Sequence, residues 1–284
     1  MVETYYPKTL SEALTIRNEK KTVLYTGGTD IMVRRKNATG LLPKFESDVL
    51  FLGHLKELQR IEVKENTLII GAGVTYAQLL SHSKVPEVLK KAIKEIASKA
   101  IRNIGTLVGN IANASPAGDT LPVLYNYNAW LNIQSKKESQ KVPINEWITG
   151  PGKTELKDNE MIVSVEMPLE DFNYVYYKKV GARKADAISK LSFVGLANIE
   201  NNTIKDLRIA FGAVAPTVVR REEVEDVIRS RKLDQVKDLL ETIEKLYSNH
   251  IKPIDDQRSS AKYRKEVSLR LLNDFLNNFE KQSS

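Results

Sequence analysis

Two glycine-bearing segments carry the residue types and spacing of a phosphate-binding site. Thr26-Gly-Gly-Thr-Asp30 places two glycines and two hydroxyls between a strand-like run and an apolar turn of helix. Backbone N–H groups in such a turn can converge on a phosphate. A second stretch of small residues, Thr106–Asp119, adds polar side chains at Asn110, Asn113, Ser115 and Asp119. The pair predicts a ligand with two phosphates and two polar ends, in which Asp119 accepts hydrogen bonds from sugar hydroxyls. For either segment alone, the alternative is a structural turn rich in small residues.

The composition excludes several other chemistries. The chain contains no cysteine, and its three histidines, His54, His82 and His250, are far apart in sequence. A disulfide, a thiol nucleophile and a Cys-ligated zinc or iron–sulfur cluster are therefore excluded in this chain, and we expect no metal site. No serine lies in a nucleophile-elbow pattern. We expect His54 and His82 to face solvent or to cap a turn.

Two further glycine motifs resemble nucleotide-binding signatures only in part. Gly71-Ala-Gly-Val-Thr-Tyr76 begins like a dinucleotide fingerprint, but Tyr76 stands where close helix packing requires glycine or alanine. We expect a tight turn that leaves a strand. Gly150-Pro-Gly-Lys-Thr154 resembles the end of a P-loop, but Trp147 stands at the first glycine of that motif and Pro151 lacks an N–H. We expect an exposed basic loop there.

The hydrophobic pattern predicts mixed helices and strands that must position these segments. In residues 1–52 we expect a helix at Leu10–Asn18, a helical turn at Ile31–Val33, and strands at Thr22–Tyr25 and Val49–Leu52. In residues 53–170 we expect a hairpin of Ile61–Val63 and Leu68–Ile70, one amphipathic helix over Pro86–Arg102, and strands at Ala129–Ile133 and Met161–Glu166. In residues 171–284 we expect strands at Tyr174–Val180, Leu191–Ile199 and Thr203–Phe211, then helices at Val218–Ser230, Asp234–Ser248 and Ser259–Phe279.

Charge and hydropathy bear on the partners and the compartment. The net charge is +7, but the basic excess is diluted along the chain, with acidic residues interleaved even at Arg220–Asp226. Nucleic-acid binders concentrate their positive charge on one face, so we expect no nucleic-acid partner. No apolar run reaches the length of a membrane span, and the N-terminus has neither the basic nor the apolar region of a secretion signal. We expect no membrane span and a cytoplasmic protein.

The two glycine-bearing segments resemble the flavin loops of molybdenum hydroxylases, the group of xanthine dehydrogenase, carbon monoxide dehydrogenase and aldehyde or glyceraldehyde oxidoreductases. Tyr25-Thr-Gly-Gly-Thr-Asp-Ile-Met-Val33 is similar to the first loop, A-G-G-T-D/H-L-L, and residues 101–119 are similar to the second, R-N-x-G-T-x-G-G-N-x-x-x-A-S-P-x-x-D. Further matches lie at Gly71–Thr75, Gly150–Thr154, Glu160–Pro168, Lys178–Ile188, Phe211–Thr217 and Asp256–Arg264.

The resemblance implies an α+β fold with three parts. A two-lobed flavin-binding domain of the vanillyl-alcohol-oxidase/PCMH-like type would have an N-terminal α/β lobe at residues 1–52 and a second lobe at residues 53–170. A C-terminal domain of a sheet covered by helices would follow at residues 171–284. The resemblance also implies non-covalent FAD, since neither loop contains a histidine.

The resemblance assigns FAD contacts residue by residue. The diphosphate is wrapped by backbone amides of Leu24, Tyr25, Thr26, Gly27, Gly28, Thr29, Asp30 and Ile31. The second wall is formed by Thr106, Leu107, Val108, Gly109 and Asn110, and Ala114 and Ser115 are further cofactor-binding residues. Asp119 holds ribityl or ribose hydroxyls, and Ile162 contacts the adenine or dimethylbenzene end. Lys179, or Lys178 in a register one residue away, lies near the flavin ring, where a cation stabilises the anionic reduced form.

Two positions depart from the family pattern. Val108 replaces the first glycine of the usual G-G-N, so the backbone approach there is looser. Ile96 lies where some relatives place an aromatic ring against the flavin. Ring stacking on that face is therefore not expected from this chain.

The resemblance explains why this chain contains no cysteine. Molybdopterin and 2Fe–2S clusters would lie on partner subunits, a large molybdopterin-binding subunit and a small iron–sulfur subunit. The substrate would be oxidised on the large subunit, and FAD on this chain would pass the electrons to an external acceptor. No side chain of this chain need be catalytic. The alternatives are a stand-alone flavoprotein oxidoreductase and a non-catalytic assembly module.

Overall fold

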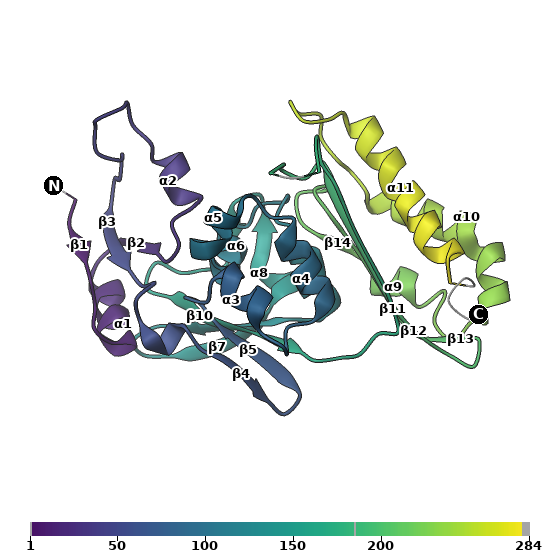
Figure 1. Cartoon of the computed structure of the whole chain (residues 1–284), viewed down its shortest axis with the longest axis horizontal. Coiled ribbons are helices and arrows are strands. Elements are labelled where there is room, and N and C mark those ends of the chain that lie inside the picture. The colour runs from purple at the N-terminus through teal and green to yellow at the C-terminus, as the bar shows by residue number, and fades with distance from the viewer. Residues whose placement is uncertain (1, 185, 280–284) are drawn as a thin grey trace. The chain divides into compact units, whose positions relative to one another are not determined.

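Two structural units, each assembled from separate stretches of sequence, make up the computed structural model, which describes residues 2–184 and 186–279 (Figure 1). Unit 1 comprises Met1–Val85, Ser98–Ala114 and Asn128–Pro168. Unit 2 comprises Pro86–Ala97, Ser115–Tyr127 and Leu169–Ser284. The three-part division of the chain expected from its sequence stays a prediction.

A small parallel sheet opens unit 1 and carries the first glycine-bearing turn. Its strands are β1 (Thr4–Tyr5), β2 (Thr22–Tyr25) and β3 (Asp48–Phe51), in the order β1-β3-β2. Helix α1 (Leu10–Glu19) connects β1 to β2, and the Thr9 side chain caps it by accepting from the Glu12 N–H at 3.1 Å. The short helix α2 (Ile31–Arg34) follows β2. The predictions for residues 10–52 are confirmed.

The larger sheet of unit 1 is antiparallel, with strand order β4-β5-β10-β6-β7. Its strands are β4 (Ile61–Lys64), β5 (Thr67–Gly71), β6 (Trp130–Gln134), β7 (Ser139–Pro143) and β10 (Met161–Pro168). The β4–β5 turn has positive φ at Glu65 and Asn66, the backbone of a tight hairpin. The expected hairpin and both expected strands are confirmed. The chain leaves β5 at Gly71 in a turn, also as expected.

Short helices and one further hairpin complete unit 1. They are a 3₁₀ turn at Lys56–Leu58, then α3 (Tyr76–Ser81), α5 (Lys99–Ile104), α6 (Leu107–Asn113), α8 (Ile144–Trp147), β8 (Ile148–Gly150) and β9 (Lys153–Thr154). Pro151 and Gly152, in the motif that resembles a P-loop, are the exposed turn between β8 and β9. That motif therefore builds a hairpin and no phosphate cradle.

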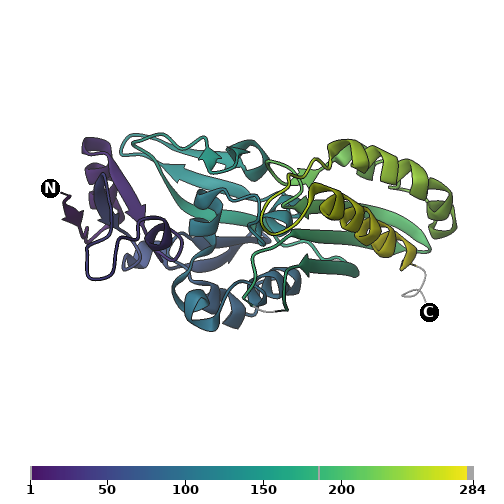
Figure 2. The same ribbon diagram turned by 90° about the horizontal axis from the view of Figure 1, so that it is seen from above.

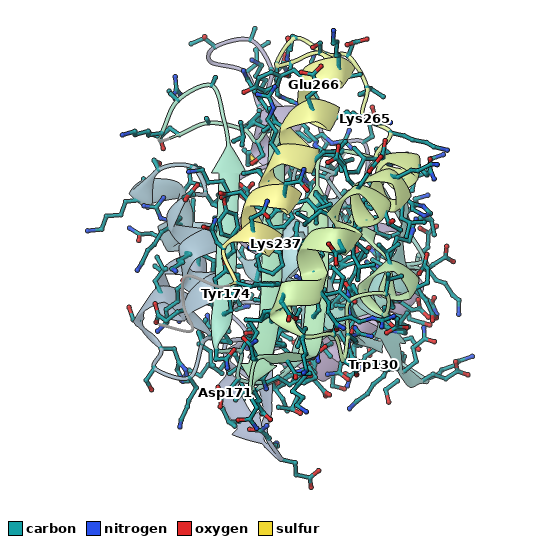
Figure 3. The ribbon with its side chains drawn as sticks, turned by 90° about the vertical axis from the view of Figure 1, so that its right-hand side faces the viewer. Trp130, Asp171, Tyr174, Lys237, Lys265 and Glu266 are labelled. Atoms are coloured by element: carbon teal, nitrogen blue, oxygen red, sulfur yellow. The ribbon has the colours of Figure 1, made fainter. Side chains whose placement is uncertain are left out.

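Unit 2 is a four-stranded antiparallel sheet with helices on both faces. The strands run β11 (Tyr174–Val180), β12 (Leu191–Glu200), β13 (Thr203–Gly212) and β14 (Val219–Arg220), in that order across the sheet. Two long helices, α10 (Leu233–His250) and α11 (Ala261–Asn277), cover one face (Figures 1 and 2). Figure 3 looks onto these helices, with Lys237 on α10 and Lys265 and Glu266 on α11. The opposite face packs against α4 (Glu87–Lys94) and α7 (Leu121–Asn126).

An aromatic cluster fixes α11 on the sheet of unit 2. The Phe275 ring lies 5.3 Å from Tyr174, 5.6 Å from Phe193 and 5.0 Å from Phe279, centroid to centroid. Gly195 on β12 provides the space for Phe275, since a Cβ there would lie 2.6 Å from the ring. Aromatic packing of this kind supplies much of the stability of a core.

The amphipathic helix expected over Pro86–Arg102 is wrong as a single element. Helix α4 ends at Lys94, and Ala97 adopts a left-handed φ of +39°. Ser98 then caps a new helix, α5, by accepting from the Ile101 N–H at 3.3 Å. The apolar spacing runs without interruption through both helices, although α4 buries its face in unit 2 and α5 belongs to unit 1. The periodicity alone could therefore not detect the break.

The helix expected over Val218–Ser230 is also wrong. Val219 and Arg220 form the edge strand β14, and only Glu222–Glu225 is helical, as α9. Glu225 is fully buried, where its carboxylate accepts from the Ile209 N–H at 2.7 Å and pairs with Arg220 at 3.1 Å. These tertiary contacts override the local helix propensity.

We expect Gly195→Ala to destabilise the protein because its new methyl group would strike the Phe275 ring, which neighbouring rings hold in place. Overpacking of this kind costs about 1–3 kcal/mol, and each kcal/mol lowers the Tm by about 2–4 °C in a chain of this size. Thermal unfolding followed by circular dichroism measures the change. Gly150→Ala is the matched control, because the nearest atom to its Cβ lies 3.8 Å away. Equal Tm values for both variants would contradict the packing argument.

Candidate functional site

The first glycine-bearing segment is the turn from β2 into α2, in unit 1. A Cβ at Gly27 would overlap the Ile104 carbonyl oxygen, so only glycine allows the turn to lie against the end of α5. Gly28 has a φ of +67°, and a side chain there would also collide with the Tyr25 ring. Both glycines are therefore required by the backbone path.

The second segment begins as a helix, α6, for which the sequence analysis predicted no regular structure. Thr106 caps α6, and its hydroxyl oxygen accepts from the Gly109 N–H at 3.0 Å. The run from Leu107 to Asn113 is helical because Leu107, Val108 and Ile111 bury one face. The Val108 side chain is 5% exposed and packs into the core, so the valine at this glycine position does not block the surface of the segment.

The structure brings the two segments together within unit 1. The hydroxyls of Thr26 and Thr106, 80 residues apart in sequence, lie 3.2 Å from each other. The Tyr76 N–H donates to the Gly105 carbonyl at 2.9 Å, which fixes the residue before Thr106. Two backbone turns with small side chains thus meet at one place. Such a surface presents N–H groups to a ligand without steric hindrance.

The remaining residues predicted for unit 1 occupy varied positions. Asp30 is exposed and its carboxylate pairs with Arg34 at 2.7 Å. Ala114 ends α6 in the left-handed conformation, and its carbonyl accepts from the Gly152 N–H at 2.9 Å. Ile162 is 5% exposed on β10, at an irregularity in its pairing with β6. The half-buried group is Leu24, Tyr25, Thr29, Ile31 and Asn110.

A buried ion pair forms the second cluster, within unit 2. The Lys179 ammonium lies 2.8 Å from Asp119 Oδ2, and the two side chains are 6% and 8% exposed. Lys179 also donates to the Glu95 carbonyl at 2.7 Å, and the Ser189 hydroxyl donates to Asp119 Oδ1. Asp119 thus has partners for both oxygens, although the sequence suggested none nearby. Lys178 is exposed, so Lys179 is the lysine of this pair that the fold buries.

Burial dominates the electrostatics of this cluster. Desolvation raises the pKa of Asp119, while Lys179 and the Ser189 hydroxyl act in the opposite direction. On the same face of β11 as Lys179, Tyr177 has its hydroxyl buried without a hydrogen-bond partner among the described residues. Burial and the charges of Asp119 and Glu95 raise the pKa of that phenol, so it stays a donor. The Tyr177 hydroxyl and one N–H of Lys179 thus lack an acceptor among the described residues.

Sequence reasoning missed Ser189 and Tyr177. The two-residue period of β11 places Tyr177 and Lys179 on one face, and this signal could have identified the tyrosine. Ser189 precedes β12 in an irregular connection, where no periodic pattern exists. Ser115 is half-buried, and its side chain accepts from the Ala117 N–H at 3.3 Å.

Residues 2–184 and 186–279 contain no cluster of three or more His, Asp or Glu side chains able to hold a metal ion. Within the same ranges, every helix is too short or too polar to cross a membrane. His54 is exposed and contacts the Pro7 carbonyl at 2.7 Å, and His82 is the C-cap of α3.

Two family models match the chain. The FAD-binding domain in molybdopterin dehydrogenase matches residues 1–170, and the C-terminal domain of the CO dehydrogenase flavoprotein matches residues 176–279. Curated relatives include the glyceraldehyde dehydrogenase medium chain of Sulfolobus acidocaldarius, 34% identical over 77% of this chain and 78% of the relative. The xanthine dehydrogenase FAD-binding subunit of Escherichia coli O157:H7 is 29% identical over 93% of this chain and 89% of the relative.

Solved structures share the fold. A carbon monoxide dehydrogenase from Hydrogenophaga pseudoflava that lacks the Mo-pyranopterin moiety aligns with a TM-score of 0.87 and 23% identity, over 97% of this chain and 96% of its own. Quinoline 2-oxidoreductase from Pseudomonas putida 86 aligns with a TM-score of 0.84 and 20% identity, over 98% of both chains. The α+β fold expected from the sequence is confirmed.

We expect Lys179→Met to destabilise the protein strongly, because it leaves the Asp119 carboxylate buried without its cation. Removing one partner of a buried pair costs about 3–5 kcal/mol. The loss of Lys179 raises the native pKa of Asp119 further, so protonation favours the folded state. The deficit in the free energy of unfolding should therefore shrink as the pH falls through that raised pKa. Urea unfolding at several pH values measures it, and a deficit independent of pH would contradict the assignment.

Proposed function

Because the chain belongs to the family of FAD-binding domains in molybdopterin dehydrogenases, we propose that it is the FAD-carrying electron-transfer subunit of a heterotrimeric molybdenum hydroxylase. The observation that carries the proposal is the meeting of the two glycine-bearing segments at Thr26 and Thr106 in unit 1. These segments are the ones that resemble the flavin loops. Their contact supports a single ligand bound by both.

The geometry of unit 1 fits a diphosphate. Glycines at 27 and 28 let the backbone of the β2–α2 turn approach α5 closely, and Thr106 begins a helix whose first N–H groups follow directly. A further glycine, Gly109, leaves room beside the Thr106 hydroxyl, since a Cβ would lie 2.8 Å from it. We assign Leu24–Ile31 and Thr106–Asn110 to the diphosphate and Ile162 to the adenine or dimethylbenzene end of FAD. Ala114 and Ser115 remain further cofactor-binding residues of the proposal.

The buried cluster of unit 2 fits the sugar and ring portions of FAD. Lys179 and Tyr177 each keep a donor without an acceptor among the described residues, and a buried donor of this kind points to a ligand. Both donors suit the oxygens and ring nitrogens of an isoalloxazine. We assign Asp119 to the ribityl or ribose hydroxyls and Lys179 to the ring.

This chain's residues have binding and tuning roles. When bound, FAD supplies the transfer of electrons between iron–sulfur clusters and an external acceptor. In this proposal the turn at Gly27 binds the diphosphate, and the Thr106 cap fixes the start of the helix that forms the second wall of the FAD site. The Lys179 ammonium holds positive charge beside Asp119. No side chain of this chain is assigned a proton transfer. We therefore assign no catalytic residue to this chain, in agreement with a subunit that only carries electrons.

The family resemblance implies two partners. Hydroxylation of a substrate by water, RH + H₂O → ROH + 2e⁻ + 2H⁺, would take place at molybdopterin on a large subunit. The two electrons would pass through 2Fe–2S clusters on a small subunit, since this chain contains no cysteine to hold such clusters. Relatives named as a medium chain and as a FAD-binding subunit support this arrangement. We propose a cytoplasmic heterotrimer.

We expect Gly27→Ala to weaken FAD binding, because its methyl group would overlap the Ile104 carbonyl and push the β2–α2 turn away from α5. Overpacking by about 1–3 kcal/mol, expressed only in the site, raises the Kd by about tenfold or more. Reconstitution of the apoprotein, followed by the quenching of flavin fluorescence, measures the Kd. Gly150→Ala, with its nearest neighbour 3.8 Å away, is the matched control and should retain the wild-type Kd.

The same reconstitution separates the proposal from its two alternatives. Wild-type protein that binds no FAD, but still assembles with its partners, would favour a non-catalytic assembly module. Wild-type protein that oxidises an aldehyde or purine alone would favour a stand-alone flavoprotein. The proposal requires non-covalent FAD in the isolated chain and, in the co-purified complex, molybdenum and iron by metal analysis.

A further inference from the structure

The Asp119 carboxylate in unit 2 is held by a residue that lies just beyond a quoted motif. The motif match at Lys178–Ile188 ends one residue before Ser189, inside the region 176–279 that the C-terminal family model matches. The Ser189 side chain is 1% exposed, and its hydroxyl donates to Asp119 Oδ1. A buried hydroxyl donor to a carboxylate disperses its negative charge and fixes its rotation.

Ser189 also limits where the Lys179 ammonium can point. An ammonium carries three N–H donors. The Glu95 carbonyl takes one at 2.7 Å, and Asp119 Oδ2 takes another at 2.8 Å. The third is left without an acceptor among the described residues. Its direction is set by the other two, and therefore by the rotation of Asp119.

The connection that carries Ser189 is anchored beside this lysine. The Lys190 N–H donates to the Val180 carbonyl at 2.8 Å, which ties the start of β12 to the end of β11. Lys179 pairs with Ser192 across the two strands. The backbone is therefore anchored from the residue after Ser189 onward, and the Ser189 hydroxyl that reaches Asp119 is buried.

We propose that Ser189 is a positioning residue of the flavin site: through Asp119 it aims the third N–H of Lys179 at the ring of FAD and sets the charge there. This inference rests on the proposed function. The pair with Asp119 neutralises Lys179, so the field at the ring depends on how much negative charge the carboxylate keeps. Ser189 reduces that charge and keeps the lysine ordered.

Two substitutions should shift the flavin midpoint potential in opposite directions. Ser189→Ala concentrates the charge of Asp119, which then neutralises more of the Lys179 charge, disfavours the negatively charged reduced ring and lowers the potential. Asp119→Asn leaves the Lys179 charge without its counter-ion and raises the potential. Loss of one hydrogen bond should raise the FAD Kd by less than about tenfold. A merely structural role would change stability or occupancy without this pair of opposite shifts.

The experiment is a spectroelectrochemical titration of the FAD-reconstituted chain at fixed pH. Ser192→Ala is the matched control, since Ser192 is also 1% exposed and pairs with Lys179 across the strands. Ser192 is not among the partners of Asp119, which in the described chain are Lys179 and Ser189. We expect the wild-type potential for Ser192→Ala. If Ser189→Ala fails to fold, Ser189→Cys keeps the volume with a weaker donor and should shift the potential in the same direction by less.

The outcomes separate this inference from the proposed function. Wild-type potentials for Ser189→Ala and Ser189→Cys, in protein that binds FAD, would overturn the role of Ser189 and leave the proposed function standing. A shift of equal size in Ser192→Ala would also overturn it. Failure of the wild-type chain to bind FAD would overturn the proposed function, and this inference with it.

Discussion

The contact between the Gly27 backbone and the Ile104 carbonyl determines how unit 1 can bind a ligand. Any side chain at position 27 would occupy the place of that oxygen, so the turn after β2 lies against α5 only because glycine stands there. The hydrogen bond between Thr26 and Thr106 follows from this approach. The surface that we propose for the diphosphate is consequently made of backbone groups and hydroxyls, which suit a phosphate and require no charged side chain.

The cluster in unit 2 differs from the glycine-bearing turns of unit 1, because it consists of buried charged side chains. Two side chains less than a tenth exposed form the Asp119–Lys179 pair, and the desolvation of such a pair is costly unless hydrogen bonds satisfy the remaining atoms. Ser189 and the Glu95 carbonyl supply those bonds. The fold thus maintains full charges in its interior at a cost in stability. A cost of this kind is retained where a field is needed, as at a redox ring.

The glycine-bearing turns and the buried cluster differ in how well the sequence predicts them. The glycine requirement is local, so the segments at Thr26–Asp30 and Thr106–Asn110 could be predicted from the order of residues, as could strands such as β2 and β11 from their composition. The break at Ala97 could not, because the apolar spacing runs through it while the two helices serve different units. Nor could the burial of Glu225, which turns a helix-like run into a strand edge and a single helical turn.

The same distinction separates Lys179, which the resemblance assigns to the flavin ring, from Ser189, which we propose positions it. The two-residue period of β11 places Lys179, whereas a hydrogen bond to the Asp119 carboxylate can come from any loop that reaches it. Here it comes from Ser189, in a connection that has no periodicity to restrict it. The contacts proposed for the diphosphate therefore lie within the motifs that resemble the flavin loops, while the hydrogen bond that we propose sets the charge at the ring comes from a connection without a local pattern.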